Sequence, residues 1–424
     1  APVVLGSSEA NARAGDWGGI RVENGSLSLT YAHLSHSGYG ISAQNLSGAG
    51  LVIDRSTITE SGRGIYLESA NGRAIVLTNN VIDVSTGYEQ SAVELYQGWN
   101  ESAPATEFVG NTVANANGQG VFFYAHRSGL NASSNVIRSS DTAISVYYPG
   151  GDTFLVANDI LNLRDYQSGN GIFIPSTENG PVTNVLIESN RIEGYGTGIY
   201  FRSNGSPIGV DIAGNELLSN STGLAVRNLQ GLSILQGLSI TSNVITGNYQ
   251  GLQLQNSVPS SLVDNVIAGN SQVGLYISHD NAELSEAFLV DGNDLSGNGT
   301  AIELHNYANV VVTGNDLSGS SQYGIANYTS NEIDARNNYW GESETDEMAL
   351  GGNPKGLGFI YDGRDEGSYG AVNYAGWLLE AGGEPSGVTV AGQLNFIDAS
   401  GAVTTTYQGG DSVVLQVVDG DRNG

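Results

Sequence analysis

The side chains of this 424-residue chain that could carry acid–base chemistry are few. Glu68 and Glu94 occur in two successive apolar runs, two places out of register, so we expect their backbones to lie roughly 8 Å apart. A carboxylate pair at such a separation could act as the acid and base of glycoside hydrolysis. Later runs of the same kind contain a second candidate group for proton transfer: His279, Asp280 and His305. Solvated acids and histidines are common on exposed strands, so all five also have a purely structural interpretation.

A larger set of side chains could bind a ligand without reacting. Side chains alternate in and out along a strand, and many outward positions here are aromatic where a solvated strand would be polar. These candidate binding residues are Tyr66, Tyr96, Phe122, Tyr124, Tyr147, Phe173 and Tyr200, near a long loop that contains Trp99. Aromatic rings pack against the apolar faces of sugars, and a hydrogen-bonding rim would come from Glu68, Glu94, His126 and Arg202. Aromatic residues also favour strands and stabilise cross-strand pairs, so packing is the alternative interpretation.

Charge restricts the ligand. The net charge of -28 and the single lysine disfavour nucleic acid and anionic membranes as partners, because both need a basic face. They also disfavour polyanionic glycans, unless calcium or a local basic patch intervenes. Arg202 and Arg227 share one outward column and could hold a sugar carboxylate, although salt bridges to nearby acids are the alternative. Charged residues make up only 14% of the chain, and a surface rich in Ser, Asn, Thr, Gly and Tyr suits neutral, hydroxyl-rich ligands or an inert stalk.

The elements that would position these side chains follow from a repeat. An asparagine followed by an apolar pair or a polar–apolar pair returns about every two dozen residues. Its positions are Asn80, Asn111, Asn135, Asn158, Asn190, Asn215, Asn243, Asn265, Asn293, Asn315 and Asn338. Between neighbouring asparagines stands a small residue followed by an alternating apolar run, as in Gly64-Ile-Tyr-Leu and Gly198-Ile-Tyr-Phe. A fixed period of this length predicts a solenoid.

The content of each period predicts the kind of solenoid. Every unit holds two or three short runs with period-two alternation and no helical pattern. Such runs bury their apolar faces only when successive units stack in parallel around one core. The recurring asparagines would then form a hydrogen-bonded ladder along the axis at one turn, where asparagine also tolerates the left-handed conformation. About thirteen coils are expected.

The pattern from about Gly15 to Trp340 resembles the right-handed parallel β-helix proteins, the pectate-lyase-like group of carbohydrate-binding and sugar-hydrolase repeats. Gly15-Asp-Trp-Gly-Gly-Ile is similar to their first coil. Similarity to their closing segment lies in Asn337-Asn-Tyr-Trp-Gly, Ile360-Tyr-Asp-Gly-Arg-Asp and Val372-Asn-Tyr-Ala-Gly-Trp-Leu. The resemblance implies an all-β fold with a β-helix over residues 1–340 and a closing segment over 341–381. Three further expected strands over 382–424 resemble the start of a β-sandwich module.

The resemblance leaves the activity open, because this fold hosts lyases, hydrolases, epimerases, adhesins and structural domains. The basic clusters and catalytic motifs of its pectate- and alginate-active members are missing here. One hypothesis is therefore a rigid glycan-binding or adhesive module of a large secreted or cell-surface protein. The other is a polysaccharide-active enzyme, a glycoside hydrolase or lyase, that works on the outward face.

The remaining expectations concern location and metals. The chain contains no cysteine, no basic or apolar leader and no apolar run long enough to span a membrane, so it reads as part of an exported protein that ends within a motif. The positions Asp419, Asp421 and Asn423 match the opening of a calcium loop, with oxygen ligands at alternate places. Its later acidic ligand is absent and the string also suits a polar turn, so we expect no tight calcium site and no other cofactor.

Overall fold

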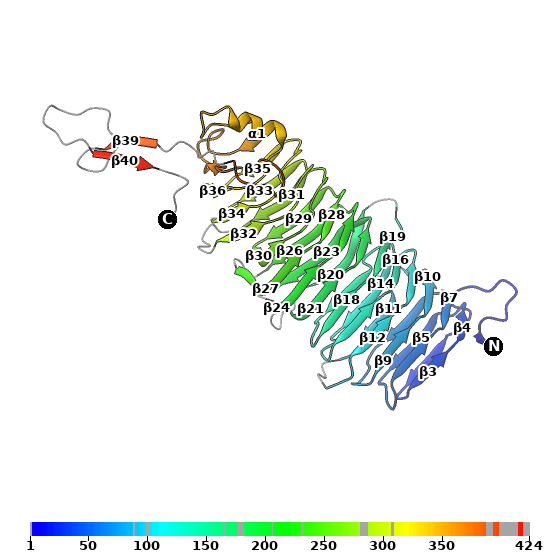
Figure 1. Ribbon diagram of the computed structural model, residues 1–424. Coiled ribbons are helices and arrows are strands. Elements are labelled where there is room, and N and C mark those ends of the chain that lie inside the picture. The colour runs from blue at the N-terminus through cyan, green and yellow to red at the C-terminus, as the bar shows by residue number, and fades with distance from the viewer. Residues whose placement is uncertain are drawn as a thin grey trace, which may run out of the picture.

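The chain folds into an elongated parallel β-solenoid, seen in the computed structural model in Figure 1. The structure describes residues 2–87, 90–98, 102–164, 167–175, 182–205, 207–229, 233–279, 287–306, 309–386, 393–397 and 414–418. Among these residues, two fourteen-stranded sheets run the length of the solenoid, and a further, ten-stranded sheet ends at β28 (Val244–Thr246), beyond which isolated bridges continue it. The predicted all-β fold is confirmed.

The strands of the three sheets interleave in chain order. The first sheet consists of β1 (Val3–Leu5), β4 (Ala32–Ser35), β7 (Thr57–Ser61), β10 (Val81–Val84), β13 (Thr112–Asn115), β16 (Val136–Ser139), β19 (Asp159–Asn162), β22 (Arg191–Glu193), β25 (Glu216–Leu218) and β28 (Val244–Thr246). The second consists of β2 (Ile20–Glu23), β5 (Tyr39–Gln44), β8 (Arg63–Leu67), β11 (Ser91–Tyr96), β14 (Gln119–Tyr124), β17 (Ile144–Tyr147), β20 (Ser168–Ile174), β23 (Tyr195–Ser203), β26 (Thr222–Asn228), β29 (Gln250–Gln255), β31 (Val273–Ser278), β33 (Thr300–His305), β35 (Tyr323–Asn327) and β37 (Ile360–Tyr361). The third consists of β3 (Leu27–Thr30), β6 (Leu51–Asp54), β9 (Ile75–Thr78), β12 (Thr106–Val109), β15 (Leu130–Ser133), β18 (Thr153–Val156), β21 (Thr183–Glu188), β24 (Ile208–Ala213), β27 (Ser233–Thr241), β30 (Ser257–Val263), β32 (Phe288–Asp291), β34 (Val310–Thr313), β36 (Ile333–Asp334) and β38 (Val372–Asn373).

The register of the second sheet is the one that the alternation predicts. Each strand pairs in parallel with the strand one coil before it, so that Tyr66, Glu94 and Phe122 lie opposite one another. The same column continues through Ser145 and Phe173 to Tyr200 on β23. Because the register holds over successive coils, side chains of equivalent positions form straight rows along the axis.

The interior of the solenoid is filled by the residues that alternate with these rows. On β14 the side chains of Val121 and Phe123 are completely buried, while Phe122 between them points outward. Phe123 packs edge-on against Phe108 of the third sheet, with ring centroids 5.6 Å apart. Equivalent pairs of aliphatic residues in each coil join one continuous core. The core lies in register under the outward rows, so it fixes where each outward side chain stands.

The asparagine ladder forms at the turn between the third and first sheets, as predicted. The Asn190 backbone N–H and side-chain Nδ2 both donate to Asn215 Oδ1, at 3.0 and 2.9 Å. Asn190 Nδ2 also donates to the Leu155 carbonyl at 2.7 Å. This pattern recurs from Asn80 to Asn338, and every member is at most 2% exposed. The amides therefore satisfy buried backbone groups at each turn.

One detail of the ladder differs from expectation. The left-handed conformation belongs to the residue before each ladder asparagine, such as Ser189 (φ 55°) or Gly214 (φ 61°), and not to the asparagine itself. The asparagines are selected for their side-chain amides, because one amide donates and accepts at the same time. A second, shorter ladder at the turn between the first and second sheets was not predicted; it contains Asn220, Asn248, Asn270 and Asn298.

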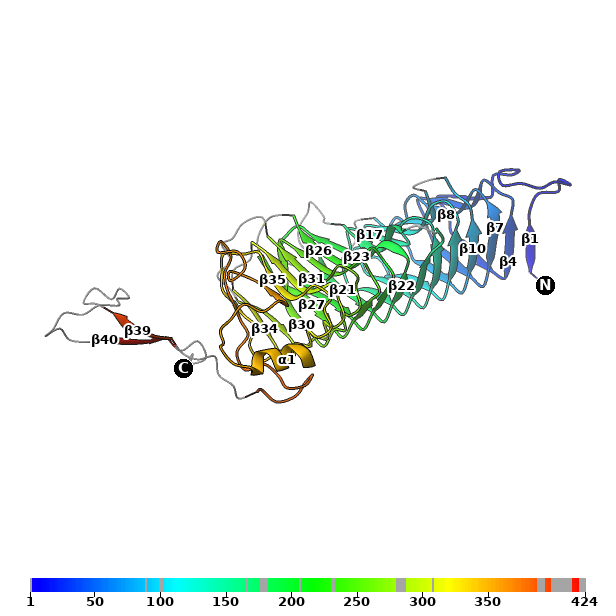
Figure 2. The same ribbon diagram turned by 90° about the horizontal axis from the view of Figure 1, so that it is seen from above.

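The C-terminal end of the solenoid is covered. The helix α1 (Glu342–Ala349) and the segment after it close this end, opposite the N-terminus in Figure 2. Trp340, Met348 and Trp377 are buried beneath this segment. The segment also supplies β37 and β38, so the second and third sheets each gain a strand beyond the thirteen expected coils. Within the part of the chain that the structure describes, no helix has the length and hydrophobicity needed to cross a bilayer.

Farther along the chain, β39 (Gln393–Ile397) and β40 (Val414–Val418) form an antiparallel pair. They fall within two of the three strands expected after residue 382. The middle one of the three expected strands, residues 402–407, lies outside the described residues. So do Asp419, Asp421 and Asn423 of the possible calcium loop.

Candidate functional site

The outer surface of the second sheet brings the predicted aromatic residues together. We define the aromatic face as the rings on its strands β5 to β23, which follow one another along the axis in Figure 1. It consists of Tyr39, Tyr66, Tyr96, Phe122, Tyr124, Tyr147, Phe173 and Tyr200. All but Tyr39 were predicted from alternation. Trp99, expected nearby, lies outside the described residues.

The rings of the aromatic face form an unbroken series of contacts. Ring centroids lie 6.1 Å apart for Tyr39 and Tyr66, and 6.5 Å apart for Tyr66 and Tyr96. Tyr96 then contacts Phe122 at 5.8 Å and Tyr124 at 5.0 Å. The series continues through Phe122–Tyr147 at 5.0 Å, Tyr147–Phe173 at 6.0 Å and Phe173–Tyr200 at 5.5 Å. These separations are those of favourable tilted, edge-on and offset ring pairs.

The aromatic face is neither core nor fully solvated. Tyr39 is 40% exposed, and the other seven rings are partly buried because they cover one another. Small residues separate the rings within the outward rows: Ser145 lies between Phe122 and Phe173, and Ala225 follows Tyr200. Each ring therefore keeps an exposed part, and together the rings form a mainly aromatic strip that Glu94 interrupts between Tyr66 and Phe122. Contiguous apolar surface of this kind marks interaction sites in soluble proteins.

A charged network is built into this face near its N-terminal end. Glu94 accepts a hydrogen bond from the Tyr96 hydroxyl at 2.9 Å and from Arg63 Nη1 at 3.3 Å. The Arg63 guanidinium also lies 5.5 Å from the ring centroid of Tyr66 and 5.8 Å from that of Tyr39. Burial, together with the Glu94 hydrogen bond, raises the pKa of Tyr96, so its hydroxyl remains a donor. Sequence reasoning missed Arg63, because it precedes the small residue that opens the run.

The two carboxylates proposed for catalysis, Glu68 and Glu94, have different surroundings. Glu68 lies just beyond the end of β8 and is exposed, whereas Glu94 is held by Arg63 and Tyr96. Both acids act on Tyr66. Burial is the largest cause of the raised pKa of Tyr66, and the negative charges of Glu94 and Glu68 raise that pKa further. Glu94 is thus an ion-paired carboxylate, which suits positioning of a ligand hydroxyl better than proton transfer.

His126 is placed away from the surface. Its ring is completely buried, and Nε2 donates to the Leu95 carbonyl at 3.0 Å. The carbonyl only accepts, so Nδ1 is the acceptor for the Thr106 hydroxyl at 2.8 Å. Burial lowers the pKa of His126 to about 4, and the ring is neutral at pH 7. His126 is a buried strut under the face and is left out of the rim.

Arg202 and Arg227 lie opposite each other on β23 and β26, at the C-terminal end of the aromatic face. The Arg202 guanidinium carbon is 5.9 Å from the Tyr200 ring centroid. Its charge also reaches Tyr147, where burial raises the pKa and the nearby arginine opposes the rise. Among the residues that the structure describes, neither arginine forms an ion pair, so the salt bridges considered from the sequence are not found.

Two of the later acid–base candidates lie on successive coils, where the His279 backbone N–H donates to the His305 carbonyl at 3.1 Å. His279 is 3% exposed, and Asp280 lies outside the described residues. His305 stands on the outer face of β33, where its Nε2 lies 2.6 Å from Glu303 Oε1. Its ring stacks on Tyr328, with centroids 4.7 Å apart, and contacts Tyr276 at 5.2 Å.

These residues belong to a second aromatic cluster that the sequence did not reveal. Tyr328 contacts Tyr361 at 5.3 Å and Tyr369 at 5.6 Å, and both partners come from the closing segment. The closing segment has no repeat, so only the folded chain shows that its tyrosines join the same sheet surface. Among the described residues, no cluster of three or more acids and histidines is arranged to hold a metal ion.

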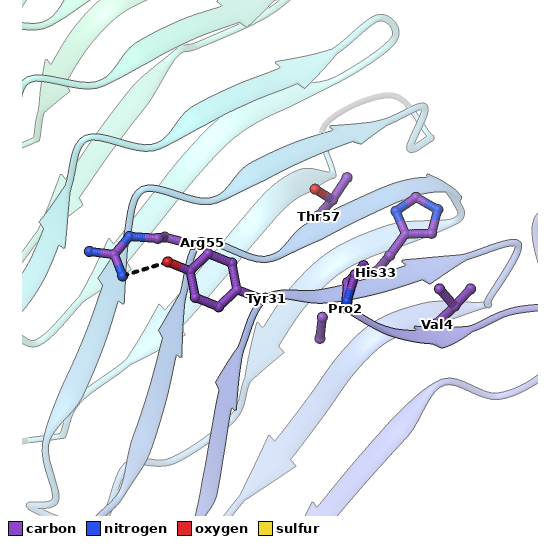
Figure 3. Close-up of a pocket in the computed structure, with 7 residues that line it drawn as sticks. Pro2, Val4, Tyr31, His33, Arg55 and Thr57 are labelled. Atoms are coloured by element: carbon purple, nitrogen blue, oxygen red, sulfur yellow. Dashed lines mark hydrogen bonds between the residues drawn. The ribbon is translucent and has the colours of Figure 1, made fainter.

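Hollows elsewhere on the surface offer fewer side-chain groups that could bind or react with a ligand. One of about 490 Å³ lies at the N-terminal end and is shown in Figure 3. It is lined by Pro2, Val4, Tyr31, Ala32, His33, Arg55 and Thr57. Arg55 donates to the Tyr31 hydroxyl at 3.1 Å and pairs with Asp54 at 3.2 Å, so its charge is already matched. The aromatic face remains the richer candidate.

Comparisons with known proteins agree with the fold. A family model described as "Right handed beta helix region" matches residues 9–160 and 170–340. No curated protein matches the chain. Among solved structures, a variant of the periplasmic alginate epimerase AlgG is similar over 66% of this chain and 76% of its own, with 14% sequence identity and a TM-score of 0.35. A likeness this distant carries no information about activity.

Proposed function

The chain belongs to the right-handed β-helix family, and we propose that it is a rigid, non-catalytic module that binds a glycan along its aromatic face. The observation that carries the proposal is the unbroken series of partly exposed rings from Tyr39 to Tyr200. Rings repeated along a straight axis suit an extended oligosaccharide, whose apolar sugar faces pack on them.

The polar groups around the rings supply the second half of such a site. Glu94 is already bonded to Arg63 and Tyr96, so its carboxylate is held in one orientation. Exposed Glu68 and the tyrosine hydroxyls offer further partners for sugar hydroxyls. The underlying core and asparagine ladder fix all these groups on one rigid surface, which lowers the entropic cost of binding. An open face leaves much of the ligand solvated, so the affinity per sugar is modest.

The proposed setting is extracellular, with the solenoid as one module of a larger secreted or cell-surface protein. The acidic, lysine-poor composition and the antiparallel strands β39 and β40 after the closing segment support this setting. A glycan is the proposed partner; nucleic acid and a membrane surface are not, since both require a basic face.

The proposal is tested by screening the wild-type protein on a broad glycan array and measuring the best ligands by calorimetry. Replacing Phe122 and Tyr200 together by alanine is expected to abolish binding while the melting temperature changes by only about a few degrees. The matched control replaces Tyr31 and Tyr249, which are 54% and 53% exposed and lie outside the aromatic face. Unfolding of the first variant, or the absence of any glycan ligand, would identify the rings as packing residues.

A second candidate function, polysaccharide cleavage, is favoured by one observation. Glu303 and His305 form a short contact of 2.6 Å between tyrosines on the same sheet surface, an arrangement able to move a proton. Incubation with neutral and acidic polysaccharides, followed by assays for reducing ends and unsaturated products, tests it. Turnover that disappears in His305→Gln would replace the binding-module proposal by an enzymatic one.

A further inference from the structure

Arg202 and Arg227 lie opposite each other at the C-terminal end of the aromatic face. The protein has 43 acidic residues against 15 lysines and arginines, so acids are available to nearly every cation. Ion pairs are formed by Arg21, Arg55, Arg63, Arg138, Arg191, Arg336 and Arg364. Arg202 and Arg227 form no ion pair with any residue that the structure describes.

This arrangement is unfavourable for the protein alone. Like charges directly opposite each other on neighbouring strands destabilise a sheet, and Arg202 and Arg227 are in register on β23 and β26. In addition, Nε of Arg202 is buried and has no hydrogen-bond acceptor among the described residues. A buried donor without a partner is rare in folded proteins and adds to the cost of this arrangement.

We propose that Arg202 and Arg227 together bind one oxyanion group of the glycan, a carboxylate or a sulfate ester, next to the rings of Phe173 and Tyr200. This inference rests on the proposed function of the aromatic face. Two guanidinium groups offer a planar set of donors that matches the oxygens of such a group. The group neutralises both arginines and removes the repulsion between them.

The rest of the face limits how much charge the ligand carries. Toward the N-terminal end, Arg63 is matched by Glu94, and exposed Glu68 adds a negative charge. Beyond Arg227, the same rows continue with Gln253 and Gln255 and reach Glu303, which is paired with His305. Consecutive acidic sugars would meet these carboxylates and the net charge of -28, and would be repelled.

The ligand class is therefore a mainly neutral oligosaccharide with sparse acidic substituents, and polyuronates are excluded from it. Because the anion site lies at one end of the rings, it also fixes the direction of the chain. The acidic sugar lies over Arg202 and Arg227, and neutral sugars extend toward Tyr66.

The test uses matched sets of hexasaccharides on xylan, mannan and β-glucan backbones. Each set contains the neutral parent, the parent with one glucuronyl group and the parent with one sulfate; hexamers of galacturonate and mannuronate complete the panel. We expect a singly charged member to bind wild-type protein at least about tenfold more tightly than its neutral parent, with the difference shrinking as salt is added. Comparing the glucuronyl and sulfate members distinguishes the two oxyanions.

The variant R202Q/R227Q is expected to bind the charged and the neutral member of each set with equal affinity, so the preference is lost. Arg21→Gln, on the same sheet but paired with Glu23, is the control and keeps the preference. Equal affinity of the wild-type protein for charged and neutral members, tightest binding of a uronate hexamer, or a charge preference that survives in R202Q/R227Q would each overturn the inference. Neutral binding without a charge preference leaves the aromatic face as a glycan site, whereas no binding at all removes both proposals.

Discussion

The asparagine ladder and the aromatic face are built from the same repeat, yet they differ in burial and in how completely their side chains are partnered within the protein. Each ladder amide is buried and has its donors and acceptor satisfied by neighbouring coils, as at Asn190. The rings of the aromatic face also contact their neighbours, but each keeps an exposed part. At the end of that face, a buried donor of Arg202 has no partner among the residues that the structure describes. The ladder, whose amides are buried and fully hydrogen-bonded, stabilises the fold, whereas the partly exposed rings can also contact a ligand.

The largest difference in stability is expected between two neighbouring residues on β14. Phe123 points into the core and is completely buried, so Phe123→Ala is expected to cost about 3–5 kcal/mol of unfolding free energy. Phe122→Ala removes only surface ring contacts and is expected to cost about 1–2 kcal/mol. Urea unfolding of both variants measures the difference. Equal losses would mean that the aromatic face is part of the packing.

The ladder itself is tested by Asn190→Ala. Removing the amide leaves the Leu155 carbonyl and its ladder neighbours without partners in a buried turn. We expect a loss of about 1–3 kcal/mol, measured by denaturant unfolding, with no effect on glycan binding. Asn204→Ala, at a surface turn after β23, serves as the comparison. A stability unchanged from wild type would show that the ladder is not a source of stability.

A pH effect separates the buried strut from the rim. The pKa of His126 is about 4 in the folded protein, below the ordinary value of 6.5, so the unfolded chain binds the proton more readily. The stability contributed by the neutral ring is complete above pH 6.5 and falls as the pH drops toward 4, by about 2 kcal/mol at pH 5. In His126→Gln this part of the pH dependence should disappear. Identical pH profiles of the two proteins would contradict the buried, neutral assignment.

The smallest effect on stability is expected at the network of Glu94. Glu94→Gln removes the ion pair with Arg63 but keeps an acceptor for the Tyr96 hydroxyl. Both charged groups are partly solvated, so we expect a loss of about 1 kcal/mol or less in thermal unfolding. Glycan affinity should fall more clearly, since Glu94 is a positioned hydrogen-bonding group of the proposed site. A large stability loss without any change in affinity would assign the network to the fold.

The sequence predicts what repeats and misses what does not. The alternation placed Tyr66, Phe122 and Tyr200 in one outward row, because period two leaves each side chain a single possible face. The second ladder escaped notice because other polar residues replace asparagine in its early coils; there Ser37 bonds Ser61.

The site's remaining parts depend on contacts outside the repeat. His126 follows β14 in a loop, where no periodicity distinguishes an inward ring from an outward one. Arg63 and the tyrosines of the closing segment join the sheet surface only through tertiary contacts. Only the folded chain shows that Arg202 and Arg227 form no ion pair with a described residue, because an ion pair depends on distance and not on composition.

The most direct test of the glycan-binding proposal is a crystal structure of the protein with its tightest array ligand. We expect an extended oligosaccharide on the second sheet, with sugar faces about 4 Å from the rings of Phe122 and Tyr200. A ligand bound instead in the hollow lined by Tyr31 and Arg55, or on the third sheet, would contradict it.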